Sequence, residues 1–109
     1  MNKYHAKKTE VDGIVFASIK ESNRYCELKL LQKCGLIDYF KVQPEFELQK
    51  KFKKNGVTYR SIKYIADFIV YYPGGKVEVE DCKGFFTKEF RIKHKLFEYQ
   101  YPDLTLKII

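Results

Sequence analysis

The spacing of hydrophobic and polar positions predicts two helices. Ser18 followed three residues later by Glu21 has the form of a helix N-cap box. The helix that it opens is expected to run until Gly35, because glycine accepts the left-handed conformation that follows a helix end. Thr87 can cap a second helix, which Pro102 should close. Both helices are therefore bounded by residues suited to those positions.

The hydrophobic positions between the two helices predict strands. The chain looks extended over residues 37–52, where Pro44 interrupts it, and again over residues 57–72, which contain the β-prone run YIADFIVYY. An Asn-Gly pair between these segments is a hairpin turn signal, and PGGK turns the chain back into VEVEDCKG. The run LTLKII is expected to form a last short strand after the second helix.

This order of elements predicts one domain over residues 1–109. Helix, three strands, helix and strand together indicate an α/β or α+β fold, with a mixed β-sheet flanked by helices. Residues 1–10 are polar and basic, and we expect them to form a flexible arm. With 45% hydrophobic residues, the chain is expected to bury a core of its own.

The charge balance points to an anionic partner. The formal net charge is +7, which attracts phosphate polymers such as DNA or anionic membranes. A dense run of lysines between residues 50 and 54 contributes to it, although a solvated loop explains that run as well. No apolar run is long enough to span a bilayer and no segment has a clean basic amphipathic face, so we expect no membrane partner. Three cysteines without a CxxC pair suggest reduced thiols and a cytoplasmic location.

The first candidate residues for a functional site lie in the second half of VEVEDCKG, after the alternating valines end. Residues two apart in a strand share a face, so Asp81 and Lys83 should project on the same side as Val77 and Val79. Burying charge at that position is costly unless the charge is paired or coordinates a metal. A structural ion pair at the strand end remains an alternative interpretation. Glu80 should face the opposite side, and we leave it out of the candidate site.

Asp67 interrupts the most apolar predicted strand. A turn centred on the two glycines of PGGK would pair residues whose numbers sum to about 149, which places Asp67 opposite about Cys82 and level with Asp81 and Lys83. A change of one residue in the turn length would place Asp67 directly opposite Asp81. Two carboxylates on adjacent strands, ~5 Å apart, make a plausible site for Mg²⁺ or Mn²⁺. An edge-strand aspartate, or one paired with a lysine, would explain Asp67 without a metal.

A third acid is sought on the first helix. Glu21 occupies the position of the capping box, but Tyr25 and Leu28 should share its helix face, so it should also look towards the protein. Glu27 is the competing choice. Gln43, on the first long strand, is a weaker candidate for a polar group that supports the site.

Taken together, these residues resemble a known signature. Asp67, a hairpin and then Asp81-Cys82-Lys83 look like the motif of the PD-(D/E)XK nuclease superfamily, with Ala66 in place of the motif proline. The wider order of SIKESNRYCEL, Gln-Pro, YIADF, VEDCKG and a lysine-rich helix is similar to a small phage-associated endonuclease family with Holliday-junction-resolvase-like members. The resemblance extends from about residue 4 to residue 102 and implies a restriction-endonuclease-like core.

The resemblance implies metal-dependent hydrolysis of DNA phosphodiesters. Asp67 and Asp81 would hold Mg²⁺, with Glu21 binding directly or through water, and Lys83 would orient the attacking water or stabilise charge on phosphorus. The metal would polarise the phosphoryl oxygen and lower the pKa of a bound water. The expected phosphate contacts are on the second helix, at Arg91, Lys93 and Lys95, although a solvated helix face is an equal alternative.

Two questions stay open at this level. A non-catalytic nucleic-acid-binding or phage regulatory module would explain the basic balance equally well, with Asp67 and Asp81 serving structure alone. Junctions, flaps, ends and specific duplex sites all remain candidate substrates. A two-fold junction would favour a homodimer with two active sites. If the protein is encoded by a phage, it would act in the cytoplasm of the bacterial host.

Overall fold

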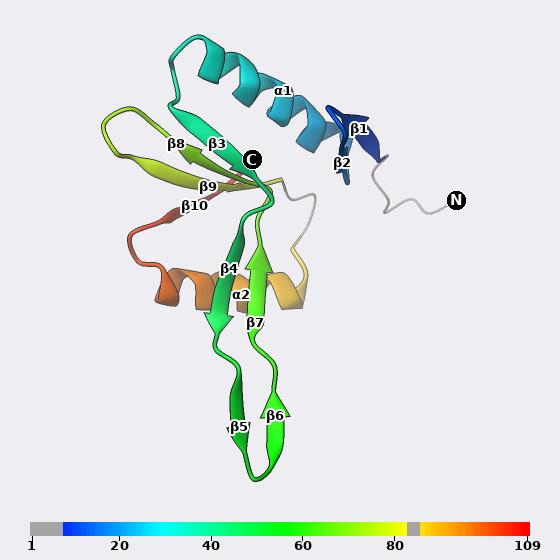
Figure 1. Cartoon of the computed structure of the whole chain (residues 1–109), viewed down its shortest axis with the longest axis vertical. Coiled ribbons are helices and arrows are strands. Elements are labelled where there is room, and N and C mark those ends of the chain that lie inside the picture. Colours follow the sequence, from blue (N-terminus) through cyan, green and yellow to red (C-terminus); the bar gives the residue numbers. More distant parts are fainter. Residues whose placement is uncertain (1–7, 83–85) are drawn as a thin grey trace.

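The computed structural model describes residues 8–82 and 86–109. Within these ranges the chain has an α+β fold of two helices and ten strands (Figure 1). The helices are α1 (Ile19–Lys33) and α2 (Lys88–Gln100). The strands are, in chain order, β1 (Thr9–Val11), β2 (Ile14–Phe16), β3 (Tyr39–Val42), β4 (Glu45–Gln49), β5 (Phe52–Lys54), β6 (Val57–Tyr59), β7 (Ile62–Ile65), β8 (Phe68–Tyr71), β9 (Val77–Asp81) and β10 (Thr105–Ile108).

The helix boundaries follow from the capping residues that the sequence predicts. The Ser18 side chain accepts a hydrogen bond from the backbone N–H of Glu21, and Thr87 accepts one from Phe90 in the same way. Gly35 follows the end of α1 with a φ of 79°, in the left-handed region that favours glycine. These predictions of where the helices begin and end are confirmed.

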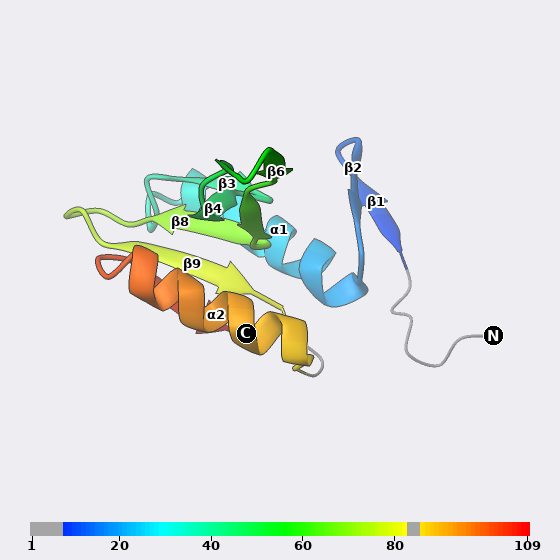
Figure 2. The ribbon, with the colours of Figure 1, turned by 90° about the horizontal axis from the view of Figure 1, so that it is seen from below.

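A mixed four-stranded sheet forms the centre of the fold. Its strand order is β10-β9-β8-β3, with β9 and β10 parallel and the other neighbours antiparallel. Its two faces are covered by different helices (Figure 2). Phe68 and Val70 pack with residues of α1, whereas Ile69 and Val79 pack with residues of α2. Alternate residues of β8 thus serve two separate cores, which explains why this strand is apolar throughout.

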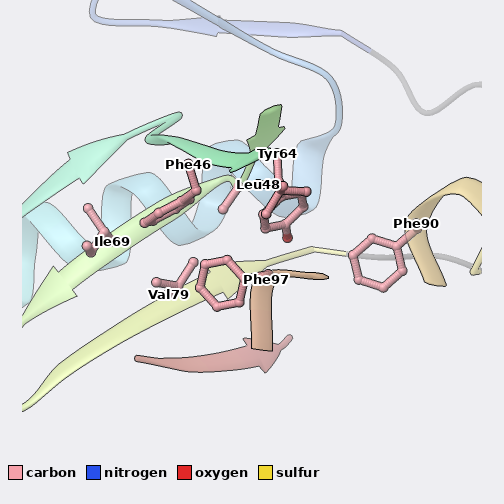
Figure 3. Close-up of a cluster of buried hydrophobic side chains, with 8 residues drawn as sticks. Phe46, Leu48, Tyr64, Ile69, Val79, Phe90 and Phe97 are labelled. Atoms are coloured by element: carbon pink, nitrogen blue, oxygen red, sulfur yellow. The ribbon is translucent and has the colours of Figure 1, made fainter. Parts of the chain in front are cut away.

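The apolar residues on the α2 side form the larger cluster, which Figure 3 shows in close-up. Phe97 is fully buried and packs edge-on against Phe46, with ring centroids 5.0 Å apart. Tyr64 lies within the same cluster, 5.7 Å from Phe97 between ring centroids. Because Tyr64 belongs to β7, this cluster fixes the strand that leads along the chain to Asp67.

A long hairpin leaves the sheet after β3. Strands β4 and β7 pair first, and β5 and β6 then continue the hairpin to a tip far from the helices (Figure 1). The tip is the predicted Asn55-Gly56 turn, with positive φ angles of 53° and 77°. The two long extended segments predicted around this turn each contain three short strands.

The N-terminal segment contains more regular structure than its polar sequence indicates. Strand β1 begins at Thr9, so the last two residues of the predicted flexible arm belong to a strand. It pairs with β2 across the turn at Asp12-Gly13. The Asp12 carboxylate accepts hydrogen bonds from Tyr25, at 2.9 Å, and Lys29, at 2.5 Å, which attach this turn to α1.

Candidate active site at the junction of β8 and β9

The two predicted strand carboxylates lie beside each other. Ile69 is opposite Val79 and Phe68 is opposite Glu80, so the next step along the two strands brings Asp67 level with Asp81. The backbone N–H of Asp67 donates to the carbonyl of Glu80 at 3.1 Å, which fixes this level. The level was predicted correctly, and the register is the alternative with a turn length changed by one residue, not the pairing with Cys82.

Partner numbers in this hairpin sum to 148 rather than 149. The reason is that Tyr71 is paired with Val77, so the connection holds five residues and is centred on Gly74 alone. The backbone N–H of Tyr72 donates to the carbonyl of Lys76 at 2.8 Å and closes this wider turn. The correction places Asp67 opposite Asp81 instead of opposite Cys82.

Asp67 is a half-buried carboxylate with an unusual proton affinity. One of its oxygens accepts a 2.6 Å hydrogen bond from the backbone N–H of Cys82, which favours the ionised form. Burial disfavours the ionised form more strongly than this bond favours it. The nearby charges of Asp81 and Glu21, and a hydrogen bond shared with Asp81, disfavour the ionised form further. Together they raise the pKa of Asp67 to about 7. Asp67 therefore exchanges its proton near neutral pH, well above the usual range of an aspartate.

Asp81 is buried and is held by a tyrosine. The hydroxyl of Tyr64 donates to Asp81 Oδ2. Burial, and then the hydrogen bond to Asp81, raise the pKa of Tyr64, so this hydroxyl stays a neutral donor. Figure 3 shows the hydroxyl of Tyr64 pointing toward the side of the cluster that Phe90 and Phe97 occupy. Tyr64 was not among the residues predicted from the sequence, although a buried tyrosine needs a partner for its hydroxyl.

The sequence left two interpretations of Glu21 open, helix capping and orientation towards the protein, and both describe its position. It takes part in the helix cap, since its N–H donates to Ser18 at 3.1 Å and its Oε2 accepts from the N–H of Ala17 at 3.2 Å. Its charge nevertheless acts on Asp67. Glu27, the competing choice, is exposed and forms an ion pair with Arg24 instead. Of the two acids on α1, Glu21 is the one near the strand carboxylates.

Gln43 is adjacent to the site through its backbone. Its N–H donates to the carbonyl of Asp67 at 2.8 Å, and its φ of 53° marks the bend between β3 and β4. The side chain of Gln43 is exposed, and a role for its amide stays a prediction. Lys83, the remaining member of the predicted set, lies outside the described residues.

Glu80 faces away from the carboxylate pair, as predicted, but it has a structural partner that the sequence did not reveal. Its carboxylate is fully buried and accepts hydrogen bonds of 2.7 Å and 2.5 Å from Nε and an Nη atom of Arg24 on α1. The bond to Glu80 raises the pKa of Arg24, which is already ionised at every accessible pH. This two-point ion pair fastens α1 to β9 directly next to the site.

The thiol of Cys82 is unsuited to nucleophilic chemistry. Burial first, and then the charges of Asp67 and Glu21, raise its pKa to about 12. A thiol with such a pKa remains protonated at neutral pH, whereas reactive cysteines have lowered values. Cys82 therefore contributes its backbone N–H to the site rather than its sulfur.

The basic residues of α2 do not form a single surface. Arg91 and Lys95 are exposed and, four residues apart, share one helix face. Lys93 is half-buried and forms an ion pair with Glu89 at 3.3 Å. It lines a shallow pocket together with Lys63 and Thr87, on a different side of the helix. Whether any of these residues contacts phosphate stays a prediction.

The donor set fits a hard divalent cation that retains several waters. No group of three or more His, Cys, Asp or Glu side chains within residues 8–82 and 86–109 is arranged to hold a metal ion. The Asp67 and Asp81 pair supplies two carboxylates, and Mg²⁺ is commonly bound through one or two carboxylates plus water and substrate phosphate. Glu21 is turned to its cap, so an influence through water suits it better than direct ligation.

The fold and this site define an α+β protein with two adjacent carboxylates at the junction of two sheet strands. The chain belongs to the family described as protein of unknown function (DUF1064), whose model matches residues 1–109. No curated protein and no solved structure matches the chain. None of the described helices is long and apolar enough to cross a membrane.

Proposed function

We propose that this protein is a Mg²⁺-dependent DNA endonuclease whose site is centred on Asp67 and Asp81. The observation that carries the proposal is the pair itself: two carboxylates at the same level of adjacent strands, where burial first and then the charge of Asp81 raise the pKa of Asp67 to about 7. Keeping two acids together in a partly buried position is unfavourable, and such arrangements concentrate at functional sites. The net charge of +7 is consistent with a polyanionic substrate.

Each residue of the site has a defined part in this proposal. Asp67 and Asp81 would hold the cation, and Mn²⁺ could replace Mg²⁺ because both prefer oxygen ligands. When bound, the cation supplies Lewis acidity toward a phosphoryl oxygen and lowers the pKa of water. The hydroxyl of Tyr64 keeps Asp81 oriented, and the N–H of Cys82 does the same for Asp67. These two donors hold the carboxylates in place before a substrate arrives.

Two more residues would complete the site. Glu21 would act through its charge and through water, and Lys83 would orient the attacking water or stabilise charge on the phosphate. The family resemblance suggests branched DNA in phage recombination or replication as the substrate, processed in the cytoplasm of a bacterial host. A two-fold junction substrate would call for a homodimer with one site in each protomer.

A cleavage panel tests the proposal. Purified protein is incubated with supercoiled, linear, flap and four-way-junction DNA, each with Mg²⁺ and with EDTA. We expect cutting or nicking of at least one substrate with Mg²⁺ alone, and its loss in Asp81→Asn. Glu47→Gln, at an exposed carboxylate of β4, is the matched control and should retain activity. Cleavage by Asp81→Asn at the wild-type rate would refute the assignment.

A second candidate is a non-catalytic nucleic-acid-binding module. The observation in its favour is that Glu21 and Asp81 both have structural partners, the helix cap and Tyr64. Under this alternative the protein binds DNA with undiminished affinity in EDTA and shows no Mg²⁺ or Mn²⁺ binding by calorimetry. Heat of Mg²⁺ binding that disappears in Asp67→Asn would favour the nuclease.

A further inference from the structure

The outer part of the long hairpin is exposed on all sides. Residues 50–60, here called the projecting hairpin, include β5 and β6, and every one of them is exposed. Within the described part of the chain, β5 and β6 pair with each other and with no other strand. An isolated two-stranded hairpin is marginally stable in water, so an unsupported one of this length calls for an explanation.

Most of the protein's excess charge lies on this hairpin. It carries five basic residues and no acid: Lys50, Lys51, Lys53, Lys54 and Arg60. Subtracting these from the net charge of +7 leaves +2 for the rest of the chain. No ion pair involves any of the five among the described residues, whereas Lys63, nearer the sheet, is paired with Glu45 at 3.5 Å. The positive field of the protein is therefore concentrated at one end of the molecule.

The projecting hairpin also has an exposed apolar face. Phe52 and Tyr59 are directly opposite each other in the register and stack with ring centroids 4.7 Å apart. They are 42% and 45% exposed, and Val57, on the same face by alternation, is 51% exposed. Lysines alone would serve to protect unpaired strand edges from other chains. The stacked pair stabilises the hairpin across its strands, but both rings keep nearly half of their surface exposed, as in a surface that contacts a partner.

We propose that the projecting hairpin binds duplex DNA at a distance from the carboxylate site. The lysines would contact the phosphates on both sides of a groove that the aromatic face enters, because Lys54 shares the face of Phe52 and Lys53 lies on the opposite face. A two-stranded β-ribbon fits the major groove of B-DNA. The five residues from Lys50 to Lys54 span ~17 Å, which is about half a helical turn of duplex. The hairpin thus has the size as well as the charge for this ligand.

The charge argues against a second copy of the chain as the partner. Two projecting hairpins placed side by side would bring ten positive charges together without an acid between them. Like charges across a sheet are destabilising, and lysine on an edge strand opposes pairing with another strand. A polyanion removes this repulsion, and release of its counterions favours binding further.

This inference shares DNA as the ligand with the proposed function, but it does not depend on cleavage. All binding is therefore measured in EDTA, where a metal-dependent enzyme is inactive. If the hairpin variants bind DNA like the wild type while the wild type still cuts, this inference fails alone. If they bind poorly and no variant or wild type ever cuts, the nuclease proposal fails alone.

Two variants remove the feature in different ways. The first replaces Lys50, Lys51, Lys53 and Lys54 with Gln and keeps the hairpin. The second deletes residues 50–61 and joins Gln49 to Ile62 by an Asn-Gly turn, which is compatible with the register because these two residues are Cα partners. The control replaces the same number of exposed lysines elsewhere with Gln: Lys8, Lys33, Lys41 and Lys107. Circular dichroism and thermal melting establish that each variant is folded.

The decisive measurement is the salt dependence of binding to a linear duplex several helical turns long. Each phosphate contact contributes about 0.9 to the slope of log K against log salt, so the lysine variant should lose about 3 to 4 from that slope. The control should lose clearly less. Hydroxyl-radical footprints of the truncated protein should be shorter on one side by about 5 base pairs. An unchanged slope and footprint would overturn the proposal.

Other partners give different results in the same experiments. A loss of affinity for single-stranded DNA with unchanged duplex binding would overturn the assignment of a duplex ligand. A wild-type dimer that becomes monomeric on truncation, measured by sedimentation equilibrium without DNA, would assign the hairpin to self-association. Aggregation of the lysine variant with unchanged DNA affinity would mean that the lysines protect the strand edges.

Discussion

The carboxylate of Asp67 accepts a 2.6 Å hydrogen bond from the backbone N–H of Cys82. This bond joins the residue before β8 to the residue after β9, across the point where the two strands diverge. It holds the carboxylate beside Asp81 although burial there raises its pKa to about 7. The geometry of the pair is therefore maintained by the backbone at a cost in stability, and that cost can be measured.

Replacing Asp67 with Asn should stabilise the protein above neutral pH. The unfolded carboxyl ionises near 3.8 and the folded one near 7, so the folded wild type binds more protons between these values. The contribution of the Asp67 carboxyl to the folding stability of the wild type is fully present below about pH 4 and is lost as the pH rises through 7. The amide oxygen of Asn can still accept a hydrogen bond from the N–H of Cys82. Because the amide does not titrate, the variant does not lose stability as the pH rises. We expect a gain of about 1–2 kcal/mol at about pH 8, a discounted fraction of ~1.4 kcal/mol per pKa unit.

Urea denaturation in EDTA at about pH 5 and about pH 8 measures this difference. The gain at the lower pH should be clearly smaller, since much of the pH-dependent loss has not yet occurred there. A gain of equal size at both values would mean that the carboxyl of Asp67 titrates normally.

Mg²⁺ should raise the melting temperature of the wild type and leave two variants unaffected. A ligand that binds only the folded state stabilises it by RT ln(1 + [L]/Kd), which is about 1.4 kcal/mol at ten times Kd. We expect this shift to disappear in Asp67→Asn and in Asp81→Asn. Glu47→Gln, which removes an exposed acid of β4, should behave like the wild type. Equal shifts in all four proteins would place the Mg²⁺ site elsewhere.

Tyr64→Phe isolates the hydroxyl that holds Asp81. The ring packs against Phe97 and would remain, whereas the buried carboxylate would lose a donor. We expect a loss of about 1–2 kcal/mol in stability and a higher Mg²⁺ concentration for half-maximal thermal shift. Tyr101→Phe removes a hydroxyl that bonds the carbonyl of Glu47 at an exposed position, and it should leave the Mg²⁺ dependence unchanged. An unaltered Mg²⁺ dependence in Tyr64→Phe would reduce Tyr64 to a packing residue.

Removing one partner of the ion pair between Arg24 and Glu80 should lower the stability of the protein strongly, whereas replacing both partners together should lower it little. Arg24→Met leaves a fully buried carboxylate without its partner, and we expect a loss of about 3–5 kcal/mol. The double variant Arg24→Met with Glu80→Met should recover most of that loss. Lys29→Ala breaks the exposed pair with Asp12 and should cost less than about 1 kcal/mol. Guanidinium denaturation compares the four proteins, and a small loss in Arg24→Met would mean that Glu80 is solvated.

The sequence predicts those parts of the fold that local chemistry determines. Ser18, Gly35 and Thr87 fix helix ends because a cap is a contact between neighbouring residues. The Asn55-Gly56 turn is equally local. The register of the hairpin between β8 and β9 was wrong by one because its turn has five residues, and two adjacent glycines allow several turn lengths. The level of Asp67 and Asp81 was nevertheless right, since both lie at the open end of that hairpin.

Contacts between distant segments account for what could not be predicted. Arg24 and Glu80 are 56 residues apart, and no pattern in either segment names the other. The donation from Tyr64 to Asp81 likewise requires β7 and β9 to be placed in space. The lysines at 50–54 fitted a solvated loop as well as a binding element. The structure places them on an exposed hairpin away from the core, where the proposed contact with DNA can be tested.

The projecting hairpin also changes how the protein should move in solution. The radius of gyration is 16.0 Å, whereas a compact domain of this length would have about 13 Å. A molecule with extents of 54 × 45 × 24 Å experiences more friction than a sphere of 13.0 kDa. Gel filtration calibrated with globular standards will therefore overstate the mass of a monomer and can imitate a dimer. Sedimentation equilibrium or light scattering, which do not depend on shape, are the measurements to use for the oligomeric state.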